Sequence, residues 1–212
     1  STGPAQAAVR DDLPYDWFED FVPVSQVTAF ASAIVVGPSF PANTMEEFIA
    51  EVKAHPGQYS YASSGNMTAV HLLSELFKEK AGLDMFHIPY QSTGAATADL
   101  ISGRVTMVID GLPARSNDIK SGTLKAFAVT SAERSPVLPE LPTLQETGVD
   151  MVDIYWTGIF APKGTPPGII ETLSKAVAKV MQEPEMKEKL LAVGTEAVGS
   201  TPDQFAALSK ST

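Results

Sequence analysis

Residues 59–77 read YSYASSGNMTAVHLLSELF, and this stretch decides the fold class. Tyr59 to Ala62 has the composition of a short buried strand. Ser63 to Asn66 then form a polar turn, and the apolar spacing after it predicts a helix that ends at Gly82. The apolar face of that helix consists of Val70, Leu72, Leu73, Leu76 and Phe77. The stretch is therefore a strand that breaks into a polar loop and enters a helix.

The same alternation continues on both sides of this stretch. The residues Thr44 and Glu47 form a capping box that predicts the start of a further helix. The other expected strands are 33–36, 85–88, 105–109 and 124–129, and the other expected helices are 95–102 and 113–120. Strands and helices that alternate strictly along the chain predict a parallel sheet, so the expected fold class is α/β.

The two ends of the chain have a different character. Residues 135–143 hold three prolines and predict an irregular segment, which a strand near 154–160 follows. After that strand the pattern is mainly helical, with amphipathic helices at 169–181 and 184–192 and a closing helix that opens at Thr201. The first 32 residues show no sustained helical or alternating pattern, so any strands there are expected to be weak.

The composition excludes several classes of partner. The 212 residues are 44% hydrophobic and 19% charged, which is the balance of a globular protein with a real core. A formal net charge of -10 repels nucleic acids and anionic membrane surfaces, so no nucleic acid partner is expected. The chain has no cysteine, and no apolar run reaches the roughly 18 residues that cross a bilayer. Residues 1–12 lack the order of a signal peptide, so we expect a removed signal or a fragment.

The polar loop carries the main candidate site. The hydroxyls of Ser63, Ser64 and Thr68, together with the unpaired N–H groups of the first helical turn, direct donors at one spot, which suits a carboxylate or a phosphate. A plain helix cap would also explain a polar residue at this position, although it accounts for only one of them. On local evidence alone, an anion site and a plain helix cap are about equally supported. His71, on the first turn, is either a ligand donor or a structural histidine. The histidine spacing is not that of a zinc site, so no metal is expected.

Two further strand ends place polar residues on the same edge, because successive parallel strands end on the same side. Asp110 follows the strand 105–109 and either meets a polar group of the ligand or caps the next helix. The turn 89–94, which contains Tyr90, follows the strand 85–88. The sequence therefore predicts three polar loops that converge.

An enzyme is the weaker interpretation of the same residues. Ser-Gly-Asn before a helix is also found in pyridoxal-phosphate enzymes, but these cradle the cofactor phosphate with a glycine-rich loop, and this chain has no Gly-Gly pair. A serine hydrolase would show a Gly-x-Ser-x-Gly elbow and an assignable triad, and neither is present. We therefore expect no cofactor and no catalysis.

A series of short segments is informative through its order along the chain. The segments are Leu13–Asp16, Asp20–Ser25, Tyr61–Asn66, Ile88–Tyr90, Leu100–Val105, Leu112–Pro113, Ala128–Ser131, Arg134–Pro139, Pro142–Thr143, Phe160–Pro166 and Gly199–Phe205. Each segment alone is a weak signal, but in this order they are specific. Together they resemble one family, the periplasmic receptors of tripartite tricarboxylate transporters, also called the Bug family.

The resemblance implies a two-lobed, Venus-flytrap receptor in the periplasm, which traps a small carboxylate-bearing ligand and hands it to membrane permease subunits. It implies ligands among amino acids, dicarboxylates, tricarboxylates or aromatic acids, held partly through ordered water. The residues that match the ligand-binding motifs are Ser63, Ser64, Gly65, Asn66, Thr68, His71 and Asp110, and Met67 and Tyr90 complete the expected ligand-binding set. A receptor that reports to a membrane sensor instead of a permease fits the same resemblance.

Two departures from the family pattern bear on the site. Met67 stands where the family usually has a small residue, which predicts a narrower or more apolar pocket. The chain also has no counterpart of the family's first ligand loop, so the first lobe is expected to be incomplete. By analogy the second lobe spans residues 34–152, and residues 1–33 and 153–212 are the remaining parts of the first lobe. The helix 169–181 would then be partly uncovered.

Overall fold

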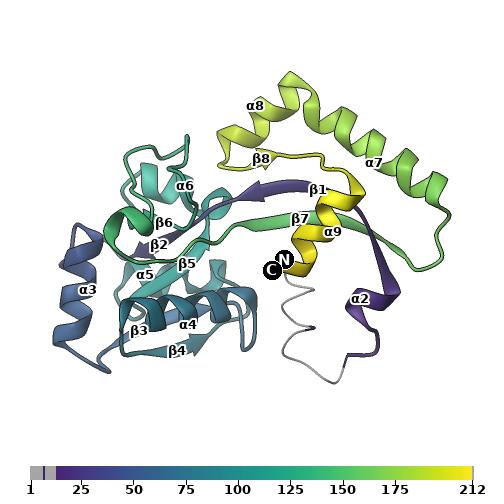
Figure 1. Cartoon of the computed structure of the whole chain (residues 1–212). Helices are drawn as coiled ribbons and strands as arrows, with labels where there is room; N and C mark the ends of the chain where they lie inside the picture. Colours follow the sequence, from purple (N-terminus) through teal and green to yellow (C-terminus); the bar gives the residue numbers. More distant parts are fainter. Residues whose placement is uncertain (1–6, 8–12, 212) are drawn as a thin grey trace. The chain divides into compact units, whose positions relative to one another are not determined.

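The computed structural model of the chain describes residue 7 and residues 13–211. Contacts between residues divide the chain into two compact units. One unit is Ala31–Ile154, and the other combines Ser1–Phe30 with Tyr155–Thr212. Each unit has its own sheet and its own helices (Figure 1). The assignment of these units to the lobes of a receptor stays a prediction.

The unit 31–154 is built on a five-stranded sheet in the order β4-β3-β5-β2-β6. Its strands are β2 (Ser32–Val36), β3 (Tyr59–Ser63), β4 (Met85–Pro89), β5 (Met107–Gly111) and β6 (Lys125–Val129). The strands lie close to the positions that the sequence pattern predicts, because each is a short apolar run between turn residues.

The prediction of a parallel sheet is wrong for one strand. β3 runs parallel to β4 and β5, but β2 runs antiparallel to both β5 and β6. After β2 the chain stays at the edge where β2 ends, since the Lys125 ammonium donates to the carbonyls of Phe40 and Ala42 at 2.9 and 3.2 Å. β3 begins at that same edge, because it is parallel to β5, whose first residue Met107 pairs with Val36 at the end of β2. The sheet is therefore mixed, as is common among α/β folds.

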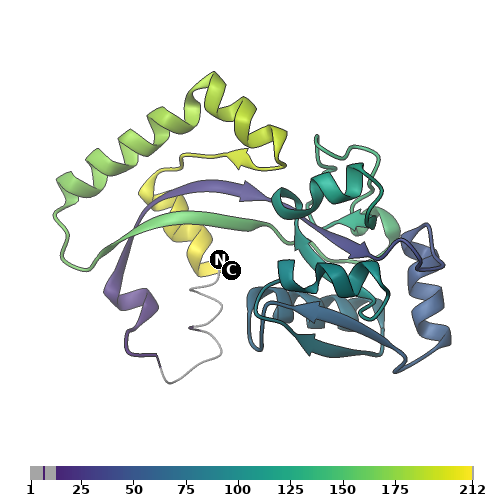
Figure 2. The same cartoon turned by 180° about the vertical axis from the view of Figure 1, so that it is seen from behind.

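Helices cover both faces of this sheet (Figures 1 and 2). They are α3 (Met45–Ala54), α4 (Ala69–Ala81), α5 (Thr97–Ile101) and α6 (Leu112–Lys120). Of the predicted helix 95–102, the first part is the 3-10 turn Gly94–Ala96 and only the rest is α5. Ala62 packs in one core cluster with Leu100 and Leu112, whereas the adjacent Tyr61 points to the opposite face, because side chains alternate along a strand.

The predicted helix signals act locally as expected. Thr44 caps α3, and its hydroxyl accepts from the Glu47 N–H at 3.2 Å. The Glu47 carboxylate reaches back to the N–H of Asn43 at 2.7 Å, one residue before the cap. Gly82 ends α4 in the left-handed conformation, with φ 65°, which glycine adopts without steric cost.

The second unit has a three-stranded antiparallel sheet in the order β7-β1-β8. Its strands are β1 (Phe21–Phe30), β7 (Tyr155–Pro162) and β8 (Glu196–Ala197), and the short helix α2 (Trp17–Asp20) precedes β1. The prediction of weak opening strands is wrong, because β1 is ten residues long. Register shifts at Pro23/Ser25 and Gln26/Thr28 interrupt its alternation of buried and exposed residues, which hides the strand from a pattern of period two.

Three helices complete this unit, namely α7 (Pro167–Gln182), α8 (Pro184–Ala192) and α9 (Pro202–Ser211). The predicted capping box of α9 is formed in both directions: Gln204 N–H donates to the Thr201 hydroxyl at 3.3 Å, and the Thr201 N–H donates to the Gln204 side chain at 3.0 Å. Along α7, Ile169 and Leu173 are 50% and 43% exposed. A stripe of apolar surface therefore runs along α7.

Candidate functional site

The candidate site lies at one edge of the five-stranded sheet. Because β3, β4 and β5 are parallel neighbours, their carboxyl ends meet at the same edge. The three junctions are the loop 64–68 between β3 and α4, the turn 90–93 after β4, and the step from Asp110 into α6 after β5. A hydrogen bond from the Tyr90 N–H to the Ser63 carbonyl, at 3.0 Å, ties the first two junctions together.

The loop from Ser63 to Thr68 is held by its own side chains. Thr68 is the cap of α4, and its hydroxyl donates to the Gly65 carbonyl at 2.9 Å and accepts from the His71 N–H at 3.4 Å. The Ser63 hydroxyl accepts from the Gly65 N–H at 3.0 Å. Met67, with φ 56°, is the only non-glycine residue at positive φ in the part of the chain that the structure describes. The loop is thus tightly folded and includes one strained residue.

Two side chains of the loop remain available to a ligand. Within residues 13–211, neither the Ser64 hydroxyl nor the Asn66 amide makes a hydrogen bond, and Asn66 is exposed. Ala69 and Val70 follow the cap as the first helical residues, where backbone N–H groups have no acceptor inside the helix. The helix dipole adds a partial positive charge at this end. The loop can therefore offer several donors to an anion.

Ser63, which the sequence also predicts as a ligand donor, differs from Ser64 and Asn66 in that its hydroxyl is already hydrogen-bonded within the protein. Its side chain is completely buried. Its oxygen lies 2.6 Å from Nε2 of His87 and 2.9 Å from the Gly65 carbonyl. These contacts favour a supporting role for Ser63 beneath the loop, with the exposed Asn66 and the half-buried Ser64 above it.

His71 also supports the loop. Its Nδ1 accepts the backbone N–H of Met67 at 3.0 Å. Its ring stacks on that of His87, with the centroids 4.0 Å apart and the planes 13° apart. Behind His87 lies the ring of Tyr61, with a centroid distance of 5.0 Å. The ring of Tyr61 also lies 6.3 Å from that of His71, so the three rings form a triangular cluster between the sheet and the first turn of α4.

Charged groups on α4 border this ring cluster. The Tyr61 hydroxyl donates to the Glu75 carboxylate, and the Lys78 ammonium lies 2.8 Å from Glu75 and 5.3 Å from the Tyr61 ring centroid. Burial, reinforced by the bond to Glu75, raises the pKa of Tyr61. Burial and then the neighbouring His71 lower the pKa of His87, so neutral His87 is favoured.

The Tyr90 side chain turns away from the loop. Its hydroxyl donates to the Asp99 carboxylate at 2.7 Å, and its ring packs against the core cluster that contains Leu100. Burial and then the bond to Asp99 raise the pKa of Tyr90. The backbone of Tyr90 therefore has the closest connection to the loop, through its bond to Ser63.

Asp110 is paired with a cation that sequence reasoning missed. The Nε of Arg115 donates to one Asp110 oxygen at 2.7 Å, and the other oxygen accepts from the Gly111 N–H at 2.9 Å. The remaining nitrogens of Arg115 donate to the Thr97 hydroxyl at 2.8 Å and to the Thr93 carbonyl at 2.7 Å. Arg115 thus joins the third junction to the second.

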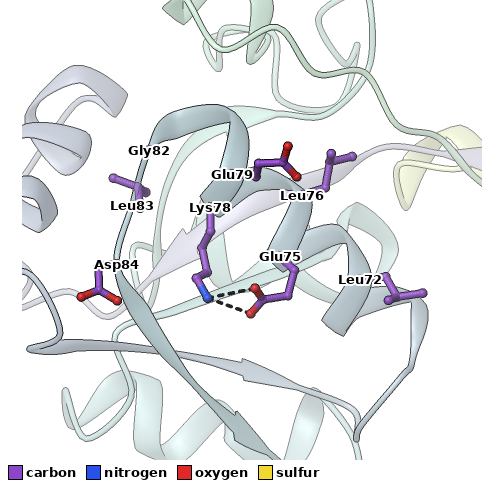
Figure 3. A pocket seen from close by; sticks show the side chains of 8 residues that line it. All are labelled: Leu72, Glu75, Leu76, Lys78, Glu79, Gly82, Leu83 and Asp84. Carbon is purple, nitrogen blue, oxygen red and sulfur yellow. Dashed lines mark hydrogen bonds and ion pairs between the residues drawn. The ribbon is translucent and has the colours of Figure 1, made fainter.

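Two surface hollows of this unit lie away from the loop. Figure 3 shows one of about 720 Å³ on the outer side of α4, where the Glu75 carboxylate meets the Lys78 ammonium. A smaller one, of about 290 Å³, is lined by Gln58 and Thr106, which precede β3 and β5 at the opposite edge of the sheet. Neither contains a residue of the loop 64–68. The candidate site is therefore defined by its donor geometry and is separate from these two hollows.

The residues that the structure describes contain neither a metal-binding cluster nor a helix that could cross a membrane. No group of three or more His, Cys, Asp and Glu side chains is placed to hold a metal ion among them. Within the same residues, every helix is too short or too polar to cross a membrane.

His87 and Arg115 are the functional candidates that sequence reasoning left out. Alternation along the strand 85–88 predicts that Met85 and His87 share a face, but only the register of the sheet places His87 beside Tyr61. Arg115 is five residues from Asp110, and the bend from β5 into α6 brings the two together. No local sequence pattern predicts the contact of His87 with Tyr61 or that of Arg115 with Asp110.

Comparison with known proteins identifies relatives along nearly the whole chain. The pattern of the tripartite tricarboxylate transporter family receptor matches residues 2–212. Protein BugT of Bordetella pertussis is 37% identical over 198 residues, which are 93% of this chain and 61% of BugT. A protein encoded in the tcbD-tcbE intergenic region of Pseudomonas sp. strain P51 is 35% identical over 94% of this chain and 60% of its own length. The chain thus spans about 60% of these two relatives.

Solved structures show the same fold. R. palustris Rpa4515 with adipate is 31% identical, with a TM-score of 0.89 over 96% of this chain and 68% of that chain. MatC from Rhodopseudomonas palustris with bound malate is 27% identical, with a TM-score of 0.87 over 99% of this chain and 71% of that chain. These likenesses confirm the predicted fold class, the α/β architecture of two-lobed periplasmic binding proteins.

Proposed function

Because this chain belongs to the receptor family of the tripartite tricarboxylate transporters, we propose that it is a periplasmic receptor for a small carboxylate-bearing solute. It binds the solute without changing it and delivers it to the permease subunits of a tripartite transporter. The ligand contacts in the unit 31–154 come from the loop 64–68 and the first turn of α4.

The donor set of this loop is the observation that carries the proposal. Ser64 and Asn66 have polar side chains that make no hydrogen bond within residues 13–211, and they flank the start of a thirteen-residue helix. Backbone N–H groups at a helix start bind carboxylates and phosphates through direct hydrogen bonds and through the helix dipole. Short-range donors are needed here because the net charge of -10 repels anions at longer range.

The ligands of two relatives narrow the choice of probe. Rpa4515 is known with adipate and MatC with malate. Both ligands are aliphatic dicarboxylates. We therefore propose an aliphatic dicarboxylate as the first ligand class to test for this chain, with water-bridged contacts completing its recognition.

The Ser63–His87 pair invites a different interpretation, because a serine bonded to a histidine is also how hydrolases activate a nucleophile. A nucleophile must reach its substrate, and Ser63 is completely buried. Its hydroxyl is occupied by the Gly65 backbone as well. Burial and these bonds support binding without turnover.

Isothermal titration of the 212-residue chain with adipate and malate tests the proposal, with the corresponding diamides as controls. Saturable binding of a dicarboxylate but not of its diamide is the expected result. Asn66→Ala and Ser64→Ala should each weaken binding by about three- to tenfold, the value of one hydrogen bond. Asn117→Ala, which removes an exposed amide from α6, should leave the affinity unchanged.

Two outcomes would contradict the proposal. One is the absence of binding by every mono-, di- and tricarboxylate and acidic amino acid tested at millimolar concentration. The other is binding that Asn66→Ala and Asn117→Ala weaken equally. Proton NMR of the recovered ligand checks the second part of the proposal, because a receptor returns the ligand unchanged.

A further inference from the structure

Two histidines hold the candidate loop from below, one at each end. His87 contacts the Ser63 hydroxyl where the loop begins, at 2.6 Å, and His71 accepts the Met67 N–H near its end, at 3.0 Å. The two imidazoles also stack on each other at 4.0 Å. The loop is therefore attached to a pair of titratable rings that lie in van der Waals contact.

The bond to Met67 depends on the protonation state of His71. A backbone N–H only donates, so Nδ1 of His71 must carry a lone pair, and the proton of the neutral ring must lie on Nε2. A protonated imidazole has a donor at both nitrogens and cannot accept this bond. Protonation of His71 would place two N–H groups against each other and release the backbone of Met67, which is already strained at φ 56°.

The surroundings decide how the pair titrates. The charged and titratable groups around the rings are Tyr61 on β3 and Glu75 and Lys78 on α4. Lys78 offsets Glu75, since their side chains are paired at 2.8 Å. Two imidazolium rings at 4.0 Å would repel each other. Burial holds the pKa of His87 below its usual range, which favours its neutral form.

We propose that His71 and His87 are positioning residues for the loop 64–68, and that protonation of this pair releases the Met67 N–H and weakens ligand binding. The loosening of the loop is independent of the proposed function. Only its effect on affinity rests on that function. The loop would thus bind its ligand tightly near neutral pH and release it as the medium becomes acidic.

The protection of the Met67 amide against hydrogen exchange tests the proposal without any ligand. In the wild-type chain, protection relative to an unstructured peptide at the same pH should fall about three- to tenfold between about pH 7.5 and about pH 5. In His71→Asn the Oδ1 atom can take the place of Nδ1 and does not titrate. That variant should keep its protection at both pH values, whereas His71→Ala should lose it at both.

His55→Asn is the matched control. His55 lies beside Glu51 on α3 and does not contact the loop, so this variant should show the wild-type loss of protection. An equal loss in wild type and His71→Asn would overturn the proposal. So would full protection of the Met67 amide in His71→Ala.

Affinity for adipate or malate, measured over the same pH range, completes the test. The affinity of the wild type and of His55→Asn should fall several-fold more than that of His71→Asn, and protonation of the ligand itself affects all three equally. If the amide responds as expected while no carboxylate binds at any pH, the proposed function fails and the positioning role stands. If carboxylates bind with the same pH profile in all three proteins, the effect on affinity is refuted.

Discussion

Arg115 connects three elements from an almost fully buried position, and its removal gives the sharpest test of how the candidate site is held together. Its side chain is 4% exposed and that of its partner Asp110 is 10% exposed. Three of its nitrogens donate at 2.7 to 2.8 Å to Asp110, Thr97 and Thr93. The β4–α5 turn and the β5–α6 junction therefore share one cation.

The substitution Arg115→Met keeps most of the apolar stem but leaves the Asp110 carboxylate buried without a cation. Breaking a buried ion pair from one side costs about 3 to 5 kcal/mol of unfolding free energy. Asp110→Asn should cost less, about 1 to 3 kcal/mol, because Arg115 keeps Asp118 at 3.6 Å and its bond to Thr97. The double variant should be more stable than the sum of the two costs predicts, by about 1 to 3 kcal/mol.

The assay must report on the unit 31–154. Both tryptophans, Trp17 and Trp156, lie outside it, so their fluorescence follows the other unit. Hydrogen exchange of peptides from β2 and β5, the central strands of the five-stranded sheet, measures the opening free energy of this unit directly. A loss below about 1 kcal/mol in Arg115→Met, or strictly additive costs in the double variant, would refute this account of the buried pair.

Three further predictions follow from single positions. Gly158→Ala would place a Cβ 2.0 Å from the Phe205 ring and should cost about 1 to 3 kcal/mol in denaturation followed by tryptophan fluorescence. Gly168→Ala, which meets no atom within 4 Å, should cost nothing, and equal losses would contradict the packing argument. Met67→Gly relieves the strain of the positive φ of 56°. It should stabilise the unit 31–154 by up to about 1 kcal/mol, measured by hydrogen exchange, whereas Met67→Ala should bring no such gain. Burial raises the pKa of Asp153, so this group stabilises less as the pH rises through its folded pKa. Asp153→Asn should therefore gain stability over wild type at pH 7 and lose that advantage in acid, and a constant difference would count against it.

Much of the fold was predictable because its signals are local. The strand at 59–63, the cap at Thr44 and the left-handed Gly82 each depend on residues within one or two turns of the chain. The strand β1 was not predicted, because its register shifts break the alternation that reveals a strand. The direction of β2 was not predicted either, since it depends on the pairing of β2 with β5 and β6, which lie far from it along the chain.

Part of the candidate site was likewise predictable from the sequence, and part was not. The loop 63–68 and its place between a strand and a helix are visible in the sequence, and so is the polar residue Asp110 at a strand end. The side-chain partners are not visible, because a strand end shows which residues can reach the edge and not which groups they meet there. Arg115 donates to both the Asp110 carboxylate and the Thr93 carbonyl, and the ligand contact of Asp110 stays a prediction.

By itself the sequence determined the α/β class, most helix boundaries, the position of the polar loop and the family. Each of these depends on periodicity, capping or ordered motifs, which are properties of neighbouring residues. Only the tertiary structure decided that Ser63 lies beneath the loop, that His71 stacks on His87 and that Asp110 is neutralised by Arg115. Those contacts depend on strand register and helix packing, which bring together residues that no local pattern relates.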